Sequence, residues 1–144
     1  MPITFRPASG DILLCEFGPD PRDPETFPLN APPVSVRPEM HKRRHVVVIN
    51  SNAANDLIVV APLSTLPPAP VKPYHYFIPA GRYPFIGRDS WLKGDMLIAV
   101  SLARLDRLKV KGSLSRTPLN ATDRRACQVA MLNALGLGRL GSHL

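Results

Sequence analysis

Apolar positions along the chain gather into short runs that are rich in β-branched residues. These runs occupy residues 10–17, 45–50, 56–63, 74–79 and 95–102. Runs of this length and composition predict β-strands. The linker SNAAN between the second and third runs suits a turn, so these two strands are expected to form a hairpin. Five or six short strands separated by loops favour a small antiparallel barrel.

The C-terminal part of the chain has a different period. Between residues 120 and 136, apolar residues recur near helical spacing: Ala126, Val129, Ala130 and Leu135. Asn120 suits the N-cap of a helix, with Asp123 three residues later, and Gly136 suits its end. One helix is therefore expected to pack on the barrel.

The segment between the first two predicted strands, residues 18–40, carries seven prolines and few large apolar residues. This composition predicts a long loop. Loops of more than about 12 to 15 residues inside compact domains are often functional lids or disordered segments. Two interpretations stay open: the loop covers or flanks a site, or it has no role.

The length of 144 residues and the hydrophobic content of 44% fit one domain that spans residues 1–144. No apolar run approaches the roughly 18 residues of a membrane helix, and the N-terminus lacks a signal-peptide pattern, so a cytoplasmic protein is expected.

Cys15 and Cys127 lie in a predicted strand and the predicted helix and are expected to be reduced and buried. The net charge of +7 is consistent with polyanion binding without establishing it.

The common catalytic signatures are missing from the chain. HExxH, CxxC, GxSxG and GxxxxGK[ST] do not occur, so zinc hydrolases, serine hydrolases and P-loop proteins lack support. His41 and His45 are four residues apart, but that spacing crosses a loop and a strand start rather than one helical face. Neither a metal site nor a cofactor is expected.

Four segments follow one another in an informative order: GDILLCEF (10–17), KRRHVVVIN (42–50), VVAPLST (59–65) and LKGDMLIAVSLARLDRL (92–108). Together they resemble the MazF/PemK family of toxins of bacterial toxin–antitoxin systems. The resemblance covers most of the chain. It implies an SH3-like barrel with a C-terminal helix, a homodimer, a cognate antitoxin, and metal-independent cleavage of single-stranded RNA.

The resemblance also implies a catalytic pair. The catalytic arginine of the family falls on Arg44, where a guanidinium can stabilise the charge that builds on a five-coordinate phosphorus. The alternative for Arg44 is an exposed strand-edge arginine that prevents aggregation. The catalytic threonine falls on Ser64, with Thr65 next to it. Serine keeps the hydroxyl, but neighbours on a strand point in opposite directions, so which of the two faces the site stays open.

Further site residues follow from the same resemblance. Asp95 matches an aspartate that some family members place near the scissile phosphate and is expected to be catalytic, while the assignment of the general acid and base stays open. Lys93 falls where relatives carry arginine, and alternation places it on the face of Asp95, where the two either act on the phosphate or form a structural salt bridge. Lys42 and Arg43 are expected to contact the RNA.

His45 stands where the family usually has proline, and it is expected to point away from the site with a structural role, because it directly follows Arg44. Four aromatic residues could stack on bases but belong more often to a core, so none of them is assigned to the site: Tyr74, Tyr76, Phe85 and Trp91. Two other functions stay open, since fold does not determine function. They are a CcdB-like toxin that poisons gyrase and a non-catalytic nucleic-acid-binding relative. The Arg44–Ser64 pair favours the ribonuclease.

Overall fold

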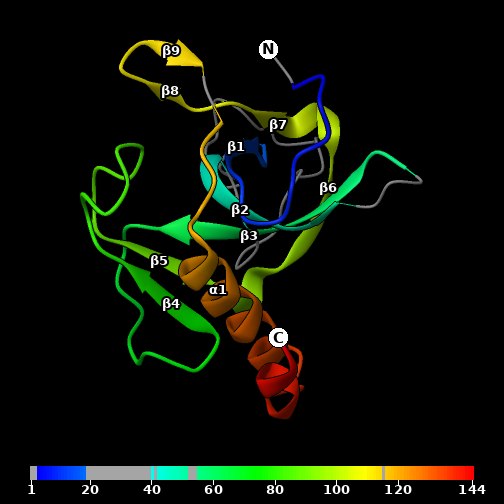
Figure 1. Ribbon diagram of the computed structural model, residues 1–144, viewed down its shortest axis with the longest axis vertical. Coiled ribbons are helices and arrows are strands. Elements are labelled where there is room, and N and C mark those ends of the chain that lie inside the picture. The colour runs from blue at the N-terminus through cyan, green and yellow to red at the C-terminus, as the bar shows by residue number, and fades with distance from the viewer. Residues whose placement is uncertain (1–2, 19–39, 41, 52–54, 115) are drawn as a thin grey trace, which may run out of the picture.

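The computed structural model describes residues 3–18, 40, 42–51, 55–114 and 116–144 (Figure 1). Almost all of the proline-rich segment 18–40, expected to be a long loop, lies outside the described residues. None of the helices in the described part is long and apolar enough to cross a membrane.

The described chain is mainly an antiparallel sheet followed by a C-terminal helix. The strands are β1 (Ile12–Glu16), β2 (Arg43–Ser51), β3 (Leu57–Ser64), β4 (His75–Ile78), β5 (Ser90–Lys93), β6 (Ile98–Ser101), β7 (Leu105–Asp106), β8 (Lys109–Val110) and β9 (Ser113–Leu114). Seven strands form one sheet in the order β4-β5-β3-β2-β1-β7, with β6 also paired to β3, and β8 and β9 form a separate ribbon. The predicted fold class is confirmed. The sheet is not closed into a ring, because no pairing between β4 and β7 is found in the described part.

The two faces of the sheet are both buried over their central part. On one face, which we call the helix face, Val47, Ala61 and Leu63 pack with residues of the C-terminal helix. On the opposite face, which we call the far face, Val46 and Val60 pack in a second cluster with residues of β6, β7 and the N-terminal segment. Because successive residues of a strand point to opposite faces, residue parity along β2 and β3 tells which face a side chain occupies.

The predicted helix is confirmed as α1 (Ala121–Ala134), which lies across the helix face (Figure 1). The Asn120 side chain accepts a hydrogen bond from the Asp123 amide at 2.7 Å, as its predicted N-cap role requires. Gly136 takes a φ of 74° just beyond the helix, a conformation that glycine adopts without strain. Leu135, expected in the apolar stripe, is instead exposed, because it lies at the C-cap where the chain turns away.

A short 3-10 helix, η3 (Gly138–His143), follows α1 and was not anticipated in the Gly-rich tail. The Arg125 guanidinium of α1 donates hydrogen bonds to the carbonyl oxygens of Leu144, at 3.2 Å, and Gly141, at 3.5 Å. These contacts fold the tail back against the helix. The sequence pattern does not predict these hydrogen bonds, because they join one long side chain to backbone atoms, which every residue has.

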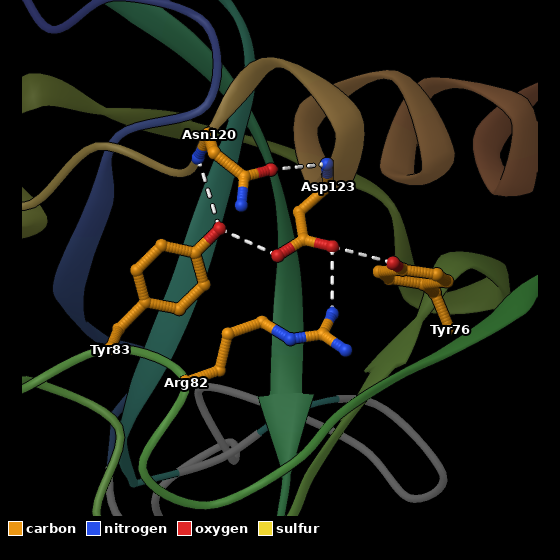
Figure 2. A network of polar contacts seen from close by, with 5 residues as sticks. All are labelled: Tyr76, Arg82, Tyr83, Asn120 and Asp123. Carbon is orange, nitrogen blue, oxygen red and sulfur yellow. Dashed lines mark hydrogen bonds and ion pairs between the residues drawn. The ribbon is translucent and has the colours of Figure 1, made fainter.

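The carboxylate of Asp123 ties the first turn of α1 to the sheet (Figure 2). The residue is 1% exposed. Its Oδ1 accepts hydrogen bonds from the Tyr76 hydroxyl at 2.6 Å and the Arg82 guanidinium at 2.9 Å, and its Oδ2 accepts one from the Tyr83 hydroxyl at 2.5 Å. The Tyr83 oxygen in turn accepts from the Asn120 amide at 3.0 Å. Burial and the hydrogen bond to Asp123 raise the pKa of Tyr83 to about 12.

The segment between β4 and β6 differs from the prediction. Residues 90–93, expected in a loop, form β5, and the strand expected at 95–102 begins only at Ile98. Between them lies the 3-10 helix η1 (Gly94–Met96). The Gly94 amide donates to the Tyr74 carbonyl at 2.9 Å, and a Cβ on Gly94 would lie 2.6 Å from that oxygen. The close backbone approach, which only glycine permits, ends β5.

The two cysteines are free and buried, as predicted. Cys15 belongs to the far-face cluster and Cys127 to the helix-face cluster, so they lie on opposite sides of the sheet. Burial raises the pKa of each thiol to about 12. Both side chains therefore act as small apolar residues of the core.

Candidate functional site

Arg44 and Ser64 lie on the same face of the sheet. The β2–β3 ladder ends at the pair Val46–Pro62, and Arg44 and Ser64 each lie two residues beyond it, so both have the parity of that pair. Residues aligned across an antiparallel ladder project to the same side. On its other edge, β2 pairs Arg44 with Cys15, whose side chain belongs to the far-face cluster. The two predicted residues thus both belong to the far face.

Thr65 and His45 lie on the opposite face. Both line a pocket of about 260 Å³ together with Leu63 and Phe85, which pack with the helix-face core. Ser64 is therefore the hydroxyl that shares a face with Arg44. Its Oγ accepts a hydrogen bond from the Leu66 amide at 3.1 Å, which leaves the hydroxyl proton available to donate.

Two aromatic side chains continue the same row across the sheet. Ser64 pairs with Trp91 of β5, and Trp91 pairs with Phe77 of β4. The Phe77 and Trp91 rings lie 4.8 Å apart between centroids, and Phe77 is 38% exposed. Ser64, Trp91 and Phe77 are thus cross-strand neighbours, and Arg44 lies on the same face of β2. We call these four residues the Arg44 row. Exposed aromatic rings of this kind can stack on the bases of single-stranded nucleic acids.

The next row on the far face borders a larger pocket. Leu92 pairs with Leu63, so the register aligns Lys93 with Pro62, one two-residue step (about 7 Å) from the Arg44 row. Lys93 pairs with His75 of β4. Both line an open pocket of about 640 Å³, together with Asp95. We call it the Lys93 pocket, and it adjoins the Arg44 row.

Asp95 reaches the pocket in a different way from the one expected. The alternation argument fails for it, because β5 ends at Lys93 and Asp95 belongs to η1. The two residues nevertheless line one pocket. Among the described side chains, no ion pair joins Lys93 to Asp95. The predicted residues therefore fall into two adjoining groups: Arg44 with Ser64, and Lys93 with Asp95.

The two basic residues before Arg44 are placed differently from it. The Arg43 guanidinium forms an ion pair with Asp106 of β7, with 2.9 Å between Nη2 and Oδ2. By parity Arg43 belongs to the helix face rather than to the face of Arg44. Lys42 is exposed and has a φ of 66°, and its backbone exchanges hydrogen bonds with Phe17 and Gly18 at the start of β2. The structure does not bring either side chain into the Arg44 row.

A sequence model of PemK-like, MazF-like toxins of type II toxin–antitoxin systems matches residues 8–130. The chain belongs to this family. Among solved structures it is similar to the Mycobacterium tuberculosis toxin MazF-mt6, with a TM-score of 0.52 and 18% sequence identity over 69% of this chain and 92% of that chain. The likeness supports the fold. No curated protein sequence matches the chain.

The match to the MazF-like family spans all the residues of both groups, from Lys42 to Asp95. Three residues beside the two groups were given no role in the site from the sequence of this MazF-like chain: Trp91, Phe77 and His75. The alternating HYF segment carried a signal for two of them, because it places His75 and Phe77 on one face and Tyr76 on the other. Which face meets Arg44 depends on the pairing of β4 with β5, which the sequence does not disclose.

Within the part of the chain that the structure describes, no three His, Cys, Asp or Glu side chains gather in a way that could hold a metal ion. The chemistry available in the Arg44 row is that of a fixed positive charge and a hydroxyl group. This set can bind and stabilise a phosphate whose negative charge increases during a reaction.

Proposed function

We propose that the chain is a toxin endoribonuclease that cleaves single-stranded RNA without a metal ion and is neutralised by a cognate antitoxin. The observation that carries the proposal is that Arg44, at the start of β2, and Ser64, at the end of β3, share the far face of the sheet in a chain of a type II toxin family. The net charge of +7 is suited to a polyanionic substrate. In this proposal the toxin acts in the cytoplasm, where its substrate is.

In the proposed reaction the 2′-hydroxyl of a nucleotide gives its proton to water as its oxygen attacks the adjacent phosphorus. The 5′-oxygen of the next nucleotide leaves and takes a proton from water. The five-coordinate phosphorus carries additional negative charge, which the Arg44 guanidinium stabilises through two hydrogen bonds. The Ser64 hydroxyl donates a further hydrogen bond to a phosphate oxygen. The products carry a 2′,3′-cyclic phosphate and a 5′-hydroxyl.

Among the residues predicted to be catalytic, the proposal keeps Arg44 and Ser64 at the scissile phosphate, because they share the far face at neighbouring strand ends. Thr65 belongs to the pocket on the helix face, so it receives no step in the reaction. Asp95 lines the Lys93 pocket beyond the Arg44 row, and it is assigned with Lys93 to binding of the strand.

The reaction is tested by incubating the purified protein with a long single-stranded RNA in excess EDTA. Discrete fragments are expected, and primer extension locates their ends. Replacing the 2′-hydroxyl at the scissile nucleotide by hydrogen should block cleavage there. A magnesium requirement, or cleavage of the deoxy-substituted position, would contradict the mechanism. Inhibition of gyrase without RNA cleavage would favour the CcdB-like alternative.

The residues are tested by a set of matched variants. Arg44→Ala should lower the cleavage rate by about 100- to 1,000-fold, the effect of losing a donor that stabilises an oxyanion. Ser64→Ala should lower it less, since a hydroxyl supplies one hydrogen bond without charge. Thr65→Ala is the control, because it removes a neighbouring hydroxyl from the opposite face. An inactive Thr65→Ala beside a fully active Ser64→Ala would mean that the site lies on the helix face.

We further propose that the toxin is a homodimer. Four exposed leucines lie after α1 in the chain and give the C-terminal segment an apolar surface: Leu135, Leu137, Leu140 and Leu144. Burying such a surface against a second copy is favourable. Light scattering should give twice the chain mass of 15.8 kDa. A mass of one chain over a wide concentration range would contradict the dimer.

A further inference from the structure

The imidazole of His75 is held in one orientation at the edge of the Lys93 pocket. The Lys72 amide donates a hydrogen bond to His75 Nδ1 at 2.9 Å, and the His75 amide donates to the Lys72 carbonyl at 2.9 Å. An Nδ1 that accepts a hydrogen bond carries no proton, so the neutral ring has its proton on Nε2. His75 therefore presents a fixed N–H donor rather than a base.

The charges around His75 favour the neutral ring and an anionic ligand. Burial lowers the pKa of His75, Asp95 raises it, and Lys93 and Lys72 lower it further, with a net lowering. Near neutral pH the edge of the pocket thus offers two ammonium groups and one imidazole N–H. Ammonium groups together with a hydrogen-bond donor form a common binding arrangement for a phosphate.

The remaining wall of the pocket is largely apolar. Tyr74, Met96 and Ile98 contribute to it, and Ile98 is 43% exposed. The volume of about 640 Å³ lies within the range of pockets that bind small ligands, roughly 300–1,000 Å³. The pocket therefore combines a cationic edge for a phosphate with an apolar surface for a base.

Gly94 determines where the Asp95 carboxylate of the pocket lies. Because its backbone contacts the Tyr74 carbonyl, η1 is held against the end of β4, and Asp95 follows directly. Asp95 is close enough to His75 to act on its pKa. A carboxylate only accepts hydrogen bonds, so it favours a ligand that brings a donor to this side of the pocket.

We propose that the Lys93 pocket binds one nucleotide of the RNA strand, with its phosphate against Lys72, Lys93 and the His75 Nε2–H and with an amino-bearing base donating to Asp95. This subsite rests on the proposed function, because it adjoins the Arg44 row and would hold a neighbouring nucleotide of the same strand. Cytosine, adenine and guanine carry an exocyclic amino group. Uracil carries carbonyl oxygens on both sides of its ring N–H, and these would be repelled by the carboxylate. Asp95 is thus assigned as a specificity-determining residue.

The phosphate contact is tested by fluorescence anisotropy with a labelled oligodeoxycytidine, which has no 2′-hydroxyl and cannot be cleaved by the proposed reaction. Lys93→Gln should weaken binding about tenfold, as loss of a charged hydrogen bond does, and should lower the salt slope by about one. Lys109→Gln is the matched control, because this exposed lysine belongs to the separate β8–β9 ribbon. Equal effects of the two substitutions would show only non-specific attraction and would overturn the subsite.

The base contact is tested by comparing oligodeoxycytidine with oligodeoxyuridine of the same length. The unmodified toxin should bind the cytidine strand about fivefold more tightly, the effect of one hydrogen bond. Asp95→Asn should bring the ratio close to one, since its amide can present either a donor or an acceptor. An unchanged ratio in Asp95→Asn, or a preference of the unmodified toxin for uridine, would overturn the assignment.

These experiments separate the subsite from the proposed function. A protein that shows the expected binding but never cleaves RNA retains the subsite and loses the ribonuclease. A protein that cleaves RNA in EDTA but shows neither the Lys93 effect nor the Asp95 effect retains the ribonuclease and loses the subsite.

Discussion

Replacing Asp123 by asparagine tests whether the buried carboxylate holds α1 on the sheet. The substitution keeps the shape of the side chain and removes its charge. In the favourable orientation the amide oxygen keeps the bonds from Tyr76 and Arg82, and the amide nitrogen faces the Tyr83 hydroxyl (Figure 2). The Tyr83 oxygen already accepts from the Asn120 amide, so the hydroxyl proton of Tyr83 loses its acceptor.

The size of the effect follows from these contacts. A hydrogen bond to a charged group contributes about 1.5–3 kcal/mol to stability, and the Tyr83 bond is lost outright. The Tyr76 bond changes from a charged to a neutral one, which costs roughly a further 0.5–1 kcal/mol. Asp123→Asn should therefore lower the free energy of unfolding by about 2–4 kcal/mol. For a chain of this length the melting temperature would fall by roughly 10 °C.

The loss is measured by urea denaturation, monitored by the fluorescence of the single tryptophan, Trp91, and by circular dichroism. Asp56→Asn serves as the control, because the Asp56 side chain is exposed and its carboxylate forms a 3.6 Å ion pair with Arg6 at the surface. Its effect should stay within about 0.5 kcal/mol. A double-mutant cycle with Tyr83→Phe should give a coupling free energy of at least about 1 kcal/mol. If Asp123→Asn and Asp56→Asn cost the same, the network does not stabilise the fold and the reasoning is refuted.

Three further predictions follow from the same packing. The pKa of Tyr83 is raised to about 12 from its usual value near 10. The protonated Tyr83 hydroxyl therefore contributes fully to stability below pH 10, and this contribution is lost as the pH rises to 12. Between pH 10 and 12 the denaturation midpoint should depend less on pH in Tyr83→Phe than in the unmodified protein. Cys15 and Cys127 should react with a thiol reagent at pH 8 only at the rate of unfolding, and rapid reaction in the native state would contradict their burial. Gly94→Ala should cost about 1–3 kcal/mol in denaturation experiments, because the new methyl group would meet the Tyr74 carbonyl, and an unchanged stability would contradict that close approach.

The elements that the sequence predicts well are those whose signals are local. The β-branched runs at 45–50 and 56–63 form β2 and β3, and α1 begins after Asn120 and ends before Gly136 as expected. In each case the alternation or the capping residue acts within the element itself. The separation of Arg44 from His45 on opposite faces follows from the same alternation.

The elements that the sequence does not predict depend on distant contacts. Residues 90–93 have little strand character alone, and they form β5 because β3 and β4 supply partners on both sides. The place of Asp95 depends on Gly94 meeting the backbone of β4 rather than on any strand pattern. The Asp123 carboxylate resembles a helix-capping residue in the sequence, but in the fold it binds two tyrosines and an arginine from distant segments.

The choice between Ser64 and Thr65 depends on the register of a single ladder. A slip of one residue in β3 would exchange the two hydroxyls between the faces. A register shift does occur in this hairpin, between Val48 and Asn50, but it lies toward the turn, whereas the pairs from Val46 to Val48 keep one register. The pairing of Arg44 with Cys15 in β1 holds the same strand end from its other side. Arg44 is thus held by its ladder with β1 and Ser64 by its ladder with β5, whereas the Lys93 pocket depends on a 3-10 turn. We therefore expect sequence changes near Gly94 to alter the proposed nucleotide binding while Arg44 and Ser64 keep their common face.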